Sequence, residues 1–100
     1  MFGVNLSRIY MELARRYKCH HFEVYSDMTL TGTSPVETLI EFRLPENILV
    51  DQSKLGKVFG KYISNVLYFK FMVENGSIYL MLHFHKKKNM LGIDYEFCLN

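Results

Sequence analysis

Several features common in other protein classes are scarce in this chain, and each shortage excludes something. Its 100 residues include only two cysteines, Cys19 and Cys98. Neither lies in the Cys-x-x-Cys pair typical of a structural zinc site, and two are too few for a disulfide scaffold. No apolar run approaches the roughly 20 residues that a membrane-spanning helix needs. The sequence also lacks a glycine-rich phosphate-binding loop and suggests no Ser-His-Asp order.

A secretory signal is missing as well. The first ten residues, MFGVNLSRIY, have no basic stretch followed by an apolar core. We therefore expect an intracellular, cytoplasmic protein that keeps Cys19 and Cys98 as reduced thiols. One disulfide joining the two is the alternative.

The excess of positive charge is small, because 12 lysines and arginines are opposed by 10 aspartates and glutamates. A net charge of +2 does not by itself indicate a nucleic-acid partner. The chain is rich instead in apolar side chains, which make up 49% of its residues. That share is ordinary for a globular protein, and a chain of this length can bury a real core. We expect a single domain over residues 1–100.

Two segments have apolar residues at the helical spacing of three and four. The first covers 5–18, and the second runs from near Asp51 to about Asn65. Gly56 and Gly60 lie four residues apart inside the second helix, where each costs up to about 1 kcal/mol relative to alanine. Another backbone passing close by would explain them, and simple tolerance of two glycines is the alternative. The residues expected on the two apolar stripes are Leu6, Ile9, Tyr10, Leu13, Ala14, Tyr17, Leu55, Val58, Phe59, Tyr62, Ile63 and Val66.

Period-two alternation of apolar and polar residues predicts the strands. Residues 20–28 and 36–44 alternate in this way, with a loop containing Gly32 and Pro35 between them. A last strand is expected over 93–99. The inward-facing residues of the first two strands are expected to be Phe22, Val24, Met28, Val36, Thr38, Ile40, Phe42 and Leu44.

Asn75-Gly76 predicts a tight β-hairpin, with positive φ at both turn positions. Taken literally, this turn fixes the register of the two arms, and every inward-facing pair is then apolar on both sides. The predicted pairs are Val73 with Ile78, Phe71 with Leu80, Phe69 with Leu82, and Leu67 with Phe84. The opposite face of the hairpin carries Tyr68, Lys70, Met72, Glu74, Tyr79, Met81, His83 and His85.

The predicted element order is helix, strand, strand, helix, strand, strand, strand. Two helices with one apolar stripe each can cover one face of an antiparallel sheet. The fold class is therefore α+β, a two-layer sandwich, and a circularly permuted ferredoxin-like arrangement is one form that it can take.

One short motif stands out on the second arm of the hairpin. His83-Phe84-His85 places two imidazoles on the same side of a strand, about 6.5–7 Å apart. The motif resembles the His-hydrophobe-His signature of the endonucleases that nick single-stranded DNA in plasmid and viral replication. The resemblance covers these three residues and implies a ferredoxin-like sheet, a divalent metal on the histidine pair and a helical tyrosine nucleophile.

The nucleophile has three helical candidates, which are Tyr10, Tyr17 and Tyr62. All three lie on the apolar stripes and are expected to face the core, where a nucleophile is useless. His20 and His21 are candidates for a third ligand, but they are adjacent, so only one can face the right way. The structural alternative is that His83 pairs with Tyr68 across the hairpin, as imidazole and aromatic rings do on half-exposed sheet faces.

The hairpin face also predicts a binding surface. Tyrosine and methionine favour the centres of protein interfaces, and aromatic sheet residues can also stack RNA bases. Carboxylates expected on the same face would repel phosphates, which favours a protein partner. The predicted binding residues of this face are Tyr68, Lys70, Met72, Tyr79, Met81, His83 and His85; the carboxylates are Glu23, Asp27, Glu37 and Glu41.

A second set of candidates is basic. Lys54, Lys57 and Lys61 lie on the second helix, and Lys86, Lys87 and Lys88 are expected in the last hairpin loop. Together they could grip a nucleic-acid backbone in a salt-dependent way. Alternatively, the loop lysines keep the hairpin soluble and discourage edge-to-edge pairing.

The sequence thus predicts a small non-catalytic binding or regulatory module that forms a homodimer and acts through a protein partner. Nucleic-acid binding is the second hypothesis, and metal-dependent nicking is the third. No cofactor, metal site or catalytic residue is predicted, and no membrane contact is expected.

Overall fold

The fold is α+β, with two helices and a four-stranded antiparallel sheet as its main elements. This computed structural model describes residues 4–26, 37–84, 86–88 and 94–96. In chain order the elements are α1 (Leu6–Tyr17), β1 (His21–Ser26), β2 (Glu37–Arg43), α2 (Gln52–Tyr62), β3 (Tyr68–Glu74), β4 (Ser77–His83), β5 (Lys86–Lys88) and β6 (Asp94–Glu96).

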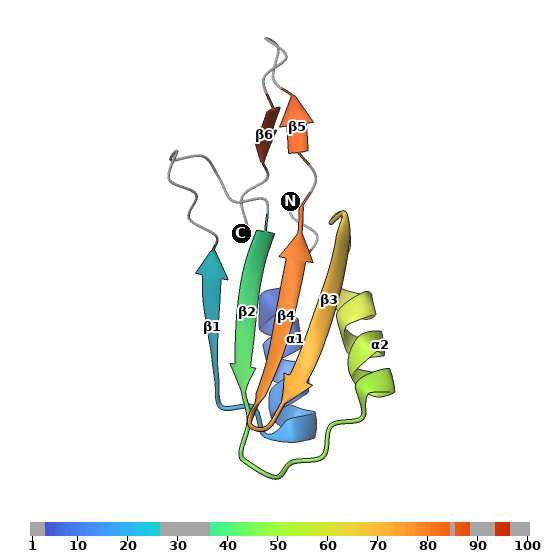
Figure 1. Cartoon of the computed structure of the whole chain (residues 1–100). Coiled ribbons are helices and arrows are strands. Elements are labelled where there is room, and N and C mark those ends of the chain that lie inside the picture. The colour runs from blue at the N-terminus through green and yellow to red at the C-terminus, as the bar shows by residue number, and fades with distance from the viewer. Residues whose placement is uncertain (1–3, 27–36, 85, 89–93, 97–100) are drawn as a thin grey trace.

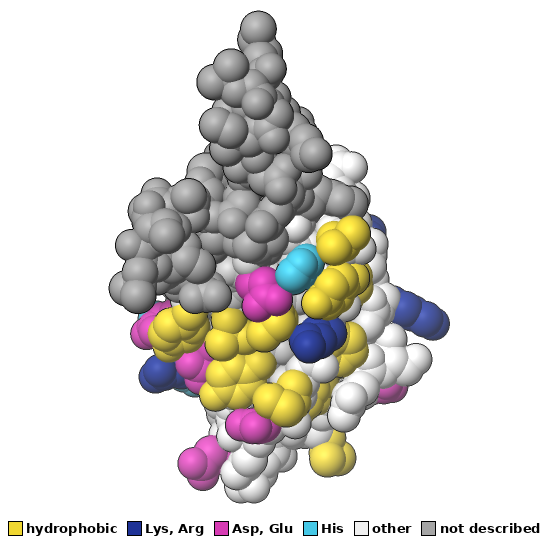
Figure 2. Space-filling view, turned by 45° about the horizontal axis from the view of Figure 1, so that its top comes forward, with side chains coloured by type: hydrophobic (Ala, Val, Ile, Leu, Met, Phe, Trp, Pro, Cys, Tyr) yellow, Lys and Arg dark blue, Asp and Glu magenta, His cyan; other side chains and the backbone are white. Residues whose placement is uncertain are grey.

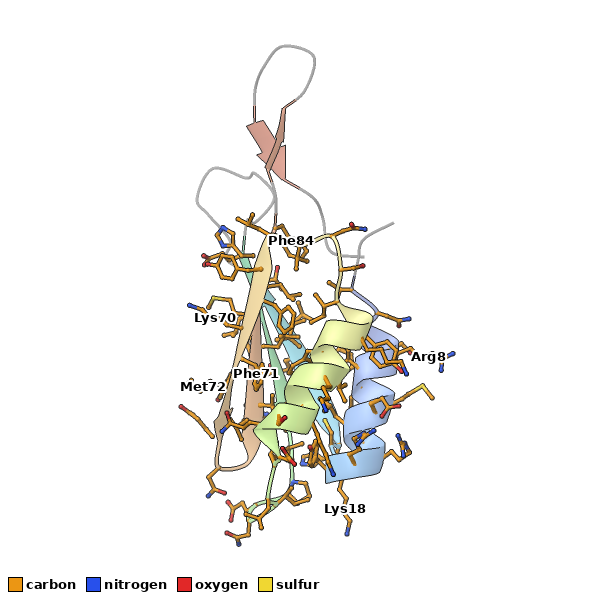
Figure 3. The ribbon with its side chains drawn as sticks, turned by 90° about the vertical axis from the view of Figure 1, so that its right-hand side faces the viewer. Arg8, Lys18, Lys70, Phe71, Met72 and Phe84 are labelled. Atoms are coloured by element: carbon orange, nitrogen blue, oxygen red, sulfur yellow. The ribbon has the colours of Figure 1, made fainter. Side chains whose placement is uncertain are left out.

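The main sheet has the strand order β1-β2-β4-β3, so each hairpin contributes one central and one edge strand. Both helices lie against one face of this sheet (Figures 1 and 3). The predicted two-layer sandwich is therefore confirmed, while the permuted ferredoxin-like arrangement stays a prediction.

The predicted hairpin register is confirmed in full along β3 and β4. Phe69 pairs with Leu82 and Phe71 with Leu80, and Tyr68 lies opposite His83. Of the two turn residues only Gly76 has a positive φ, however, so the prediction that both adopt it was wrong. The turn also docks on the end of β2, since the amide of Leu44 donates to the carbonyl of Gly76 at 2.9 Å.

The core fills the space between the helices and the inner face of the sheet. Phe42 and Phe59 are fully buried, with ring centroids 6.2 Å apart. These two rings belong to a series of aromatic contacts that continues to Phe22 on β1 and to Phe69 and Phe71 on β3. The other buried apolar residues include Val4, Ile9, Leu13, Tyr17, Ile40, Leu44, Leu55, Val58, Ile63, Ile78, Leu80, Leu82 and Phe84.

Two residues expected inside are exposed instead. Val24 is 41% exposed, because β1 is an edge strand that the helices only partly cover. Leu67 is 53% exposed, because it precedes β3 and its chain is only beginning to join the sheet there. Its amide donates to the carbonyl of His83 at 2.8 Å, and His83 is the register partner of Tyr68, so the predicted pairing of Leu67 with Phe84 is not part of the observed register.

The second helix ends earlier than predicted. It stops at Tyr62, not at about Asn65, and Ile63 leaves the helix to form an isolated bridge with Val4. Pairing with the residues before α1 thus replaces another helical turn, and Val66 packs on the core from beyond the helix. At the other end Asp51 is the N-cap, and its carboxylate accepts from two backbone amides of the first turn.

The glycines inside α2 are not sites of close backbone approach. A Cβ at Gly56 would meet only the Phe71 ring, at 3.7 Å, and one at Gly60 would meet nothing within 4 Å. The prediction of a neighbouring backbone was therefore wrong, and tolerance of the two glycines is the remaining explanation.

The C-terminal part of the chain differs from the prediction. Lys86–Lys88 forms strand β5 and is not a hairpin loop; it pairs with β6 in a separate two-stranded sheet. The strand predicted over 93–99 is described only at 94–96. Cys19 is buried, which raises the pKa of its thiol, whereas its pairing with Cys98 falls outside the described residues. The same applies to the predicted positions of Met28, Val36 and Asp27.

Candidate binding face of the sheet

The face of the main sheet that points away from the helices carries an apolar patch (Figure 2). Figure 3 shows Lys70 and Met72 pointing to this side, while Phe71 points toward α2. Met72 is 54% exposed and Tyr68 is 45% exposed, although both are large side chains in a regular strand. We call this surface the sheet patch and define it by Leu39, Tyr68, Met72, Tyr79 and Met81.

The centre of the sheet patch is a shallow hollow. Its volume is about 330 Å³, near the lower limit for small-molecule pockets. A flat, shallow surface of this size is better suited to side chains of a partner than to an enclosed ligand. The lining residues are Leu39, Lys70, Phe71, Met72, Tyr79 and Met81.

Leu39 is the member of the sheet patch that the sequence prediction missed. It lies between Glu37 and Glu41 on β2 and pairs with Met81 on β4. The signal was present, because strict alternation in 36–44 puts an odd-numbered leucine on the outer face. One apolar residue between two glutamates does not by itself indicate a contact surface. Its role became clear only from its neighbour on the adjacent strand, Met81.

Glu41 organises the polar border of the sheet patch. Its Oε2 accepts hydrogen bonds from Ser77 Oγ at 2.8 Å and Tyr79 Oη at 3.4 Å. Arg43 Nε lies 3.6 Å from the same oxygen. The Glu41 side chain is only 12% exposed, so these partners replace most of the water that its carboxylate would bind. The bond to Glu41 holds the hydroxyl end of Tyr79, which lines the hollow of the sheet patch.

A second carboxylate lies beside Glu41 on the neighbouring strand β1. Glu23 on β1 is its register partner, and like charges at such positions normally repel. The Tyr25 hydroxyl lies between the two carboxylates, 2.5 Å from Glu23 Oε2 and 3.3 Å from Glu41 Oε1. The hydroxyl has one proton and donates it to one carboxylate at a time, with the shorter contact to Glu23. This bond, followed by one from His21, lowers the pKa of Glu23, and the same Tyr25–Glu23 bond raises the pKa of Tyr25.

The lowered pKa of Glu23 predicts how stability changes with pH. A carboxyl whose folded pKa lies below its ordinary value of 4.5 stabilises the fold above that pH. The contribution disappears as pH falls through the folded pKa, because the protonated acid gains nothing from the charge-assisted bonds. We expect Glu23→Gln to lower the melting temperature near neutral pH and to match the wild type well below pH 4.5.

The effect is expected to be small, since the Glu23 side chain is exposed to solvent. Glu46→Gln, at an exposed glutamate outside this network, is the matched control and should give a curve parallel to the wild type. Thermal unfolding followed by circular dichroism from pH 3 to 7 makes the comparison. If the melting temperature of Glu23→Gln differed from that of the wild type by the same amount at all pH values, the lowered pKa of Glu23 would be contradicted.

The structure places His83 in a pair of contacts that explain its position without a metal. Its Nδ1 is 2.9 Å from Glu37 Oε1, and its ring stacks on Tyr68 with centroids 4.8 Å apart and planes 11° apart. His85, the other half of the motif, lies outside the described residues. Within the described part of the chain, no three histidine, cysteine, aspartate or glutamate side chains gather as metal ligands do.

The tyrosines that the nicking resemblance requires are not displayed at this face. Tyr17 is buried, and Tyr10 and Tyr62 pack against the core from the helices. His21, one of the two candidate third ligands, is bonded to Glu23 on β1. The geometry on this face therefore gives the nicking hypothesis no support.

The structure separates the two kinds of predicted binding residue. The described members of the aromatic set, Tyr68, Met72, Tyr79, Met81 and His83, come together on the sheet with Lys70 beside them. Lys54, Lys57 and Lys61 lie on α2, in the layer behind the sheet. Lys86–Lys88 is placed as backbone in β5, and its side chains are outside the described part.

Comparisons with protein-family models, with curated proteins and with solved structures found no match for this chain. Neither described helix has the length and apolar character needed to cross a lipid bilayer.

Proposed function

We propose that this chain is a non-catalytic binding module whose sheet patch contacts a protein, with a second copy of the chain as its first partner. The observation that supports the proposal most is an apolar surface, made of two tyrosines, two methionines and a leucine, that no described element covers. Contiguous apolar surface with a polar border is typical of protein interfaces, and tyrosine and methionine are enriched at their centres.

The polar groups around the sheet patch favour binding over catalysis. Glu41 accepts hydrogen bonds from Ser77 and Tyr79. His83 is hydrogen-bonded to Glu37 and stacks on the Tyr68 ring. Groups held in mutual hydrogen bonds orient the apolar side chains between them. They form a border with defined hydrogen bonds, as interface rims do.

The distribution of charge across the face favours a second copy. Three carboxylates gather on the β1–β2 side, at Glu23, Glu37 and Glu41, with Arg43 beside Glu41, whereas β3 at the other edge carries Lys70 and, at its end, Glu74. Two sheets packed face to face about a two-fold axis parallel to the strands bring β3 of one copy over β1 of the other. Lys70 of each copy then faces the partner's carboxylates, and the two apolar centres meet.

The size of the face sets the expected strength. Four strands about 4.8 Å apart, three of them seven residues long and β1 six, cover roughly 19 by 23 Å, or about 440 Å² per copy. A standard interface buries about 800 Å² per partner. We therefore expect a weak, reversible dimer with a dissociation constant on the order of 10–100 µM.

Sedimentation velocity of Met72→Glu tests the proposal. In the proposed dimer, position 72 on β3 lies opposite the carboxylates of the partner's β1–β2 side, so a glutamate there would place like charges face to face. We expect the dissociation constant to rise at least about tenfold relative to the wild type, because like charges held against each other across an interface cost several kcal/mol.

Met11→Glu is the matched control. Met11 has nearly the same exposure, 58% against 54%, but lies on α1 in the layer behind the sheet. It should leave the association unchanged, with circular dichroism confirming that both variants fold. A wild-type protein that stays monomeric up to several hundred micromolar, or equal weakening by both substitutions, would refute the second copy as the partner.

A further inference from the structure

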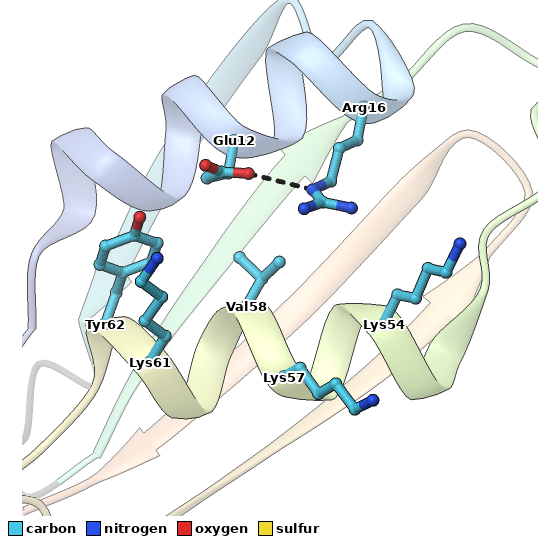
Figure 4. A pocket seen from close by; sticks show the side chains of 7 residues that line it. All are labelled: Glu12, Arg16, Lys54, Lys57, Val58, Lys61 and Tyr62. Carbon is cyan, nitrogen blue, oxygen red and sulfur yellow. Dashed lines mark hydrogen bonds and ion pairs between the residues drawn. The ribbon is translucent and has the colours of Figure 1, made fainter.

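The outer side of the helical layer has a basic groove between α1 and α2 (Figure 4). Arg16 and Lys54 lie at one end of this groove, and Lys61 and Tyr62 lie at the other. Val58 forms the floor between them and is buried, so the groove has an apolar base and charged walls. The complete lining is Glu12, Arg16, Lys54, Lys57, Val58, Lys61 and Tyr62.

The single carboxylate of the groove does not neutralise its lysines. Glu12 Oε2 accepts from Arg16 at 3.0 Å and from Arg15 at 2.8 Å, and these two bonds, that from Arg16 first, lower the pKa of Glu12. Among the described residues no ion pair joins Glu12 or another carboxylate to the three lysines of α2, so they present an unbalanced positive surface.

The whole helical layer shares this imbalance, which the small net charge of the chain conceals. Residues 5–18 and 51–62 carry seven lysines or arginines and two acids, whereas 19–26, 37–50 and 63–84 carry two and five. The two layers of the sandwich therefore have opposite charge, and a polyanion is attracted to the helices and repelled by the sheet.

The spacing of the lysines suits a repeating anion. Residues 54, 57 and 61 follow one side of α2, and a rise of 1.5 Å per residue spreads them over about 10 Å. That length spans several phosphates of one nucleic-acid strand. Tyr62 adds a ring at the end of the groove, with Lys61 Nζ 5.3 Å from its centroid. An aromatic ring beside cations is the combination with which proteins bind single strands, by stacking a base and holding its phosphate.

We propose that the groove between α1 and α2 binds single-stranded nucleic acid, with Lys54, Lys57 and Lys61 on consecutive phosphates and Tyr62 against a base. This site is separate from the sheet patch and does not depend on the protein-binding proposal. Little sequence preference is expected, because phosphates and base faces carry almost no sequence information.

Fluorescence anisotropy with a labelled 12-nucleotide oligo(dT) at 50 mM salt tests the site. Three phosphate contacts to a single strand contribute about 2 to the slope of log K against log salt. The triple variant Lys54→Gln, Lys57→Gln, Lys61→Gln should lose that slope and on the order of 100-fold in affinity at 50 mM salt. Tyr62→Leu should weaken binding by about 5- to 100-fold with the slope unchanged, since stacking releases no counterions.

The groove double variant Lys54→Gln, Lys57→Gln has a charge-matched control, Arg8→Gln, Lys18→Gln, which removes two cations outside both the groove and the sheet patch. The control should weaken binding less than about threefold, because these cations make no direct phosphate contact. Circular dichroism confirms that each variant folds. Equal losses in the two double variants would overturn the groove as the site, and so would an absence of binding at 50 mM salt.

Two further ligands decide the class of polyanion. Polyglutamate of similar length offers charge without bases, and a 12-base-pair duplex hides its bases in the stack. The proposal expects both to bind more weakly than oligo(dT) and to be insensitive to Tyr62→Leu. Polyglutamate binding as tightly as oligo(dT) would identify an acidic protein segment as the better partner, and tighter duplex binding would overturn the single-strand assignment.

Discussion

Phe42→Ala is expected to lower the free energy of unfolding by about 3–5 kcal/mol, the largest effect of any single substitution proposed for this chain. Phe42 is fully buried on the central strand β2, and its ring lies 6.0 Å from that of Phe22 and 6.2 Å from that of Phe59. It therefore joins β1 to α2 through the sheet. Its removal leaves a cavity between partners that are fixed in β1 and α2 and cannot close over it.

Urea unfolding followed by circular dichroism measures the loss, which is a large share of the 5–15 kcal/mol that small domains possess. Tyr68→Ala is the matched control, because it truncates an aromatic residue on a strand of the same sheet but on the open face. It should cost less than about 1 kcal/mol, the value of its stacking on His83. If Phe42→Ala does not fold, Phe42→Leu should still fold with a loss of about 1–2 kcal/mol. Equal losses for Phe42→Ala and Tyr68→Ala would contradict the assignment of inner and outer faces.

Gly76→Ala is expected to cost about 1–2 kcal/mol, the penalty for placing a residue with a Cβ in the left-handed region. Gly76 has φ of 84°, whereas an added Cβ would meet nothing closer than the carbonyl oxygen of Leu44, at 3.8 Å. The cost is thus conformational and not steric. Because this turn sets the register of β3 against β4, the strain falls on the element that sorts apolar from polar side chains.

Gly60→Ala provides a control with the opposite sign. Gly60 lies in α2 with open space around its Cα, so a methyl group there should raise stability by up to about 1 kcal/mol through helix propensity. Both variants can be followed by the same urea titration. A stabilising Gly76→Ala would show that the turn differs from the one described.

Local signals in the sequence were sufficient for much of this fold. The turn at Asn75-Gly76 and the alternation around it predicted the pairing of β3 and β4, because residues close in sequence decide a hairpin. The two helices followed from their apolar spacing for the same reason. The end of α2 could not be predicted from local signals, because Ile63 leaves the helix to pair with Val4, which is 59 positions away in the sequence.

The candidate sites depended more strongly on long-range packing. Tyr79 and Met81 could be assigned to the outer face from the hairpin alone, whereas the role of Leu39 required the pairing of β2 with β4. The Glu41 hydrogen bonds join three strands, and the groove beside Lys54 exists only because α1 packs against α2. Such contacts between distant segments leave no periodic pattern in the sequence.

The two proposed sites are compatible in one assembly. The sheet patch and the groove lie on opposite sides of the sandwich, so a dimer that buries both sheet patches leaves two grooves facing outward. Two sites on one particle would bind a long strand more tightly than one, through the raised local concentration of the second site. Weak dimerisation and strand binding would then reinforce each other.

Methionine methyl NMR on a dilution series tests the central claim most directly, because it needs no substitution at the surface in question. The proposal that the open sheet face is a contact surface predicts concentration-dependent shifts for the methyl signals of Met72 and Met81 between about 10 and 500 µM. Met11, on α1, should stay constant over the same range. Constant Met72 and Met81 signals, or a shift at Met11 alone, would show that this chain does not associate through its sheet.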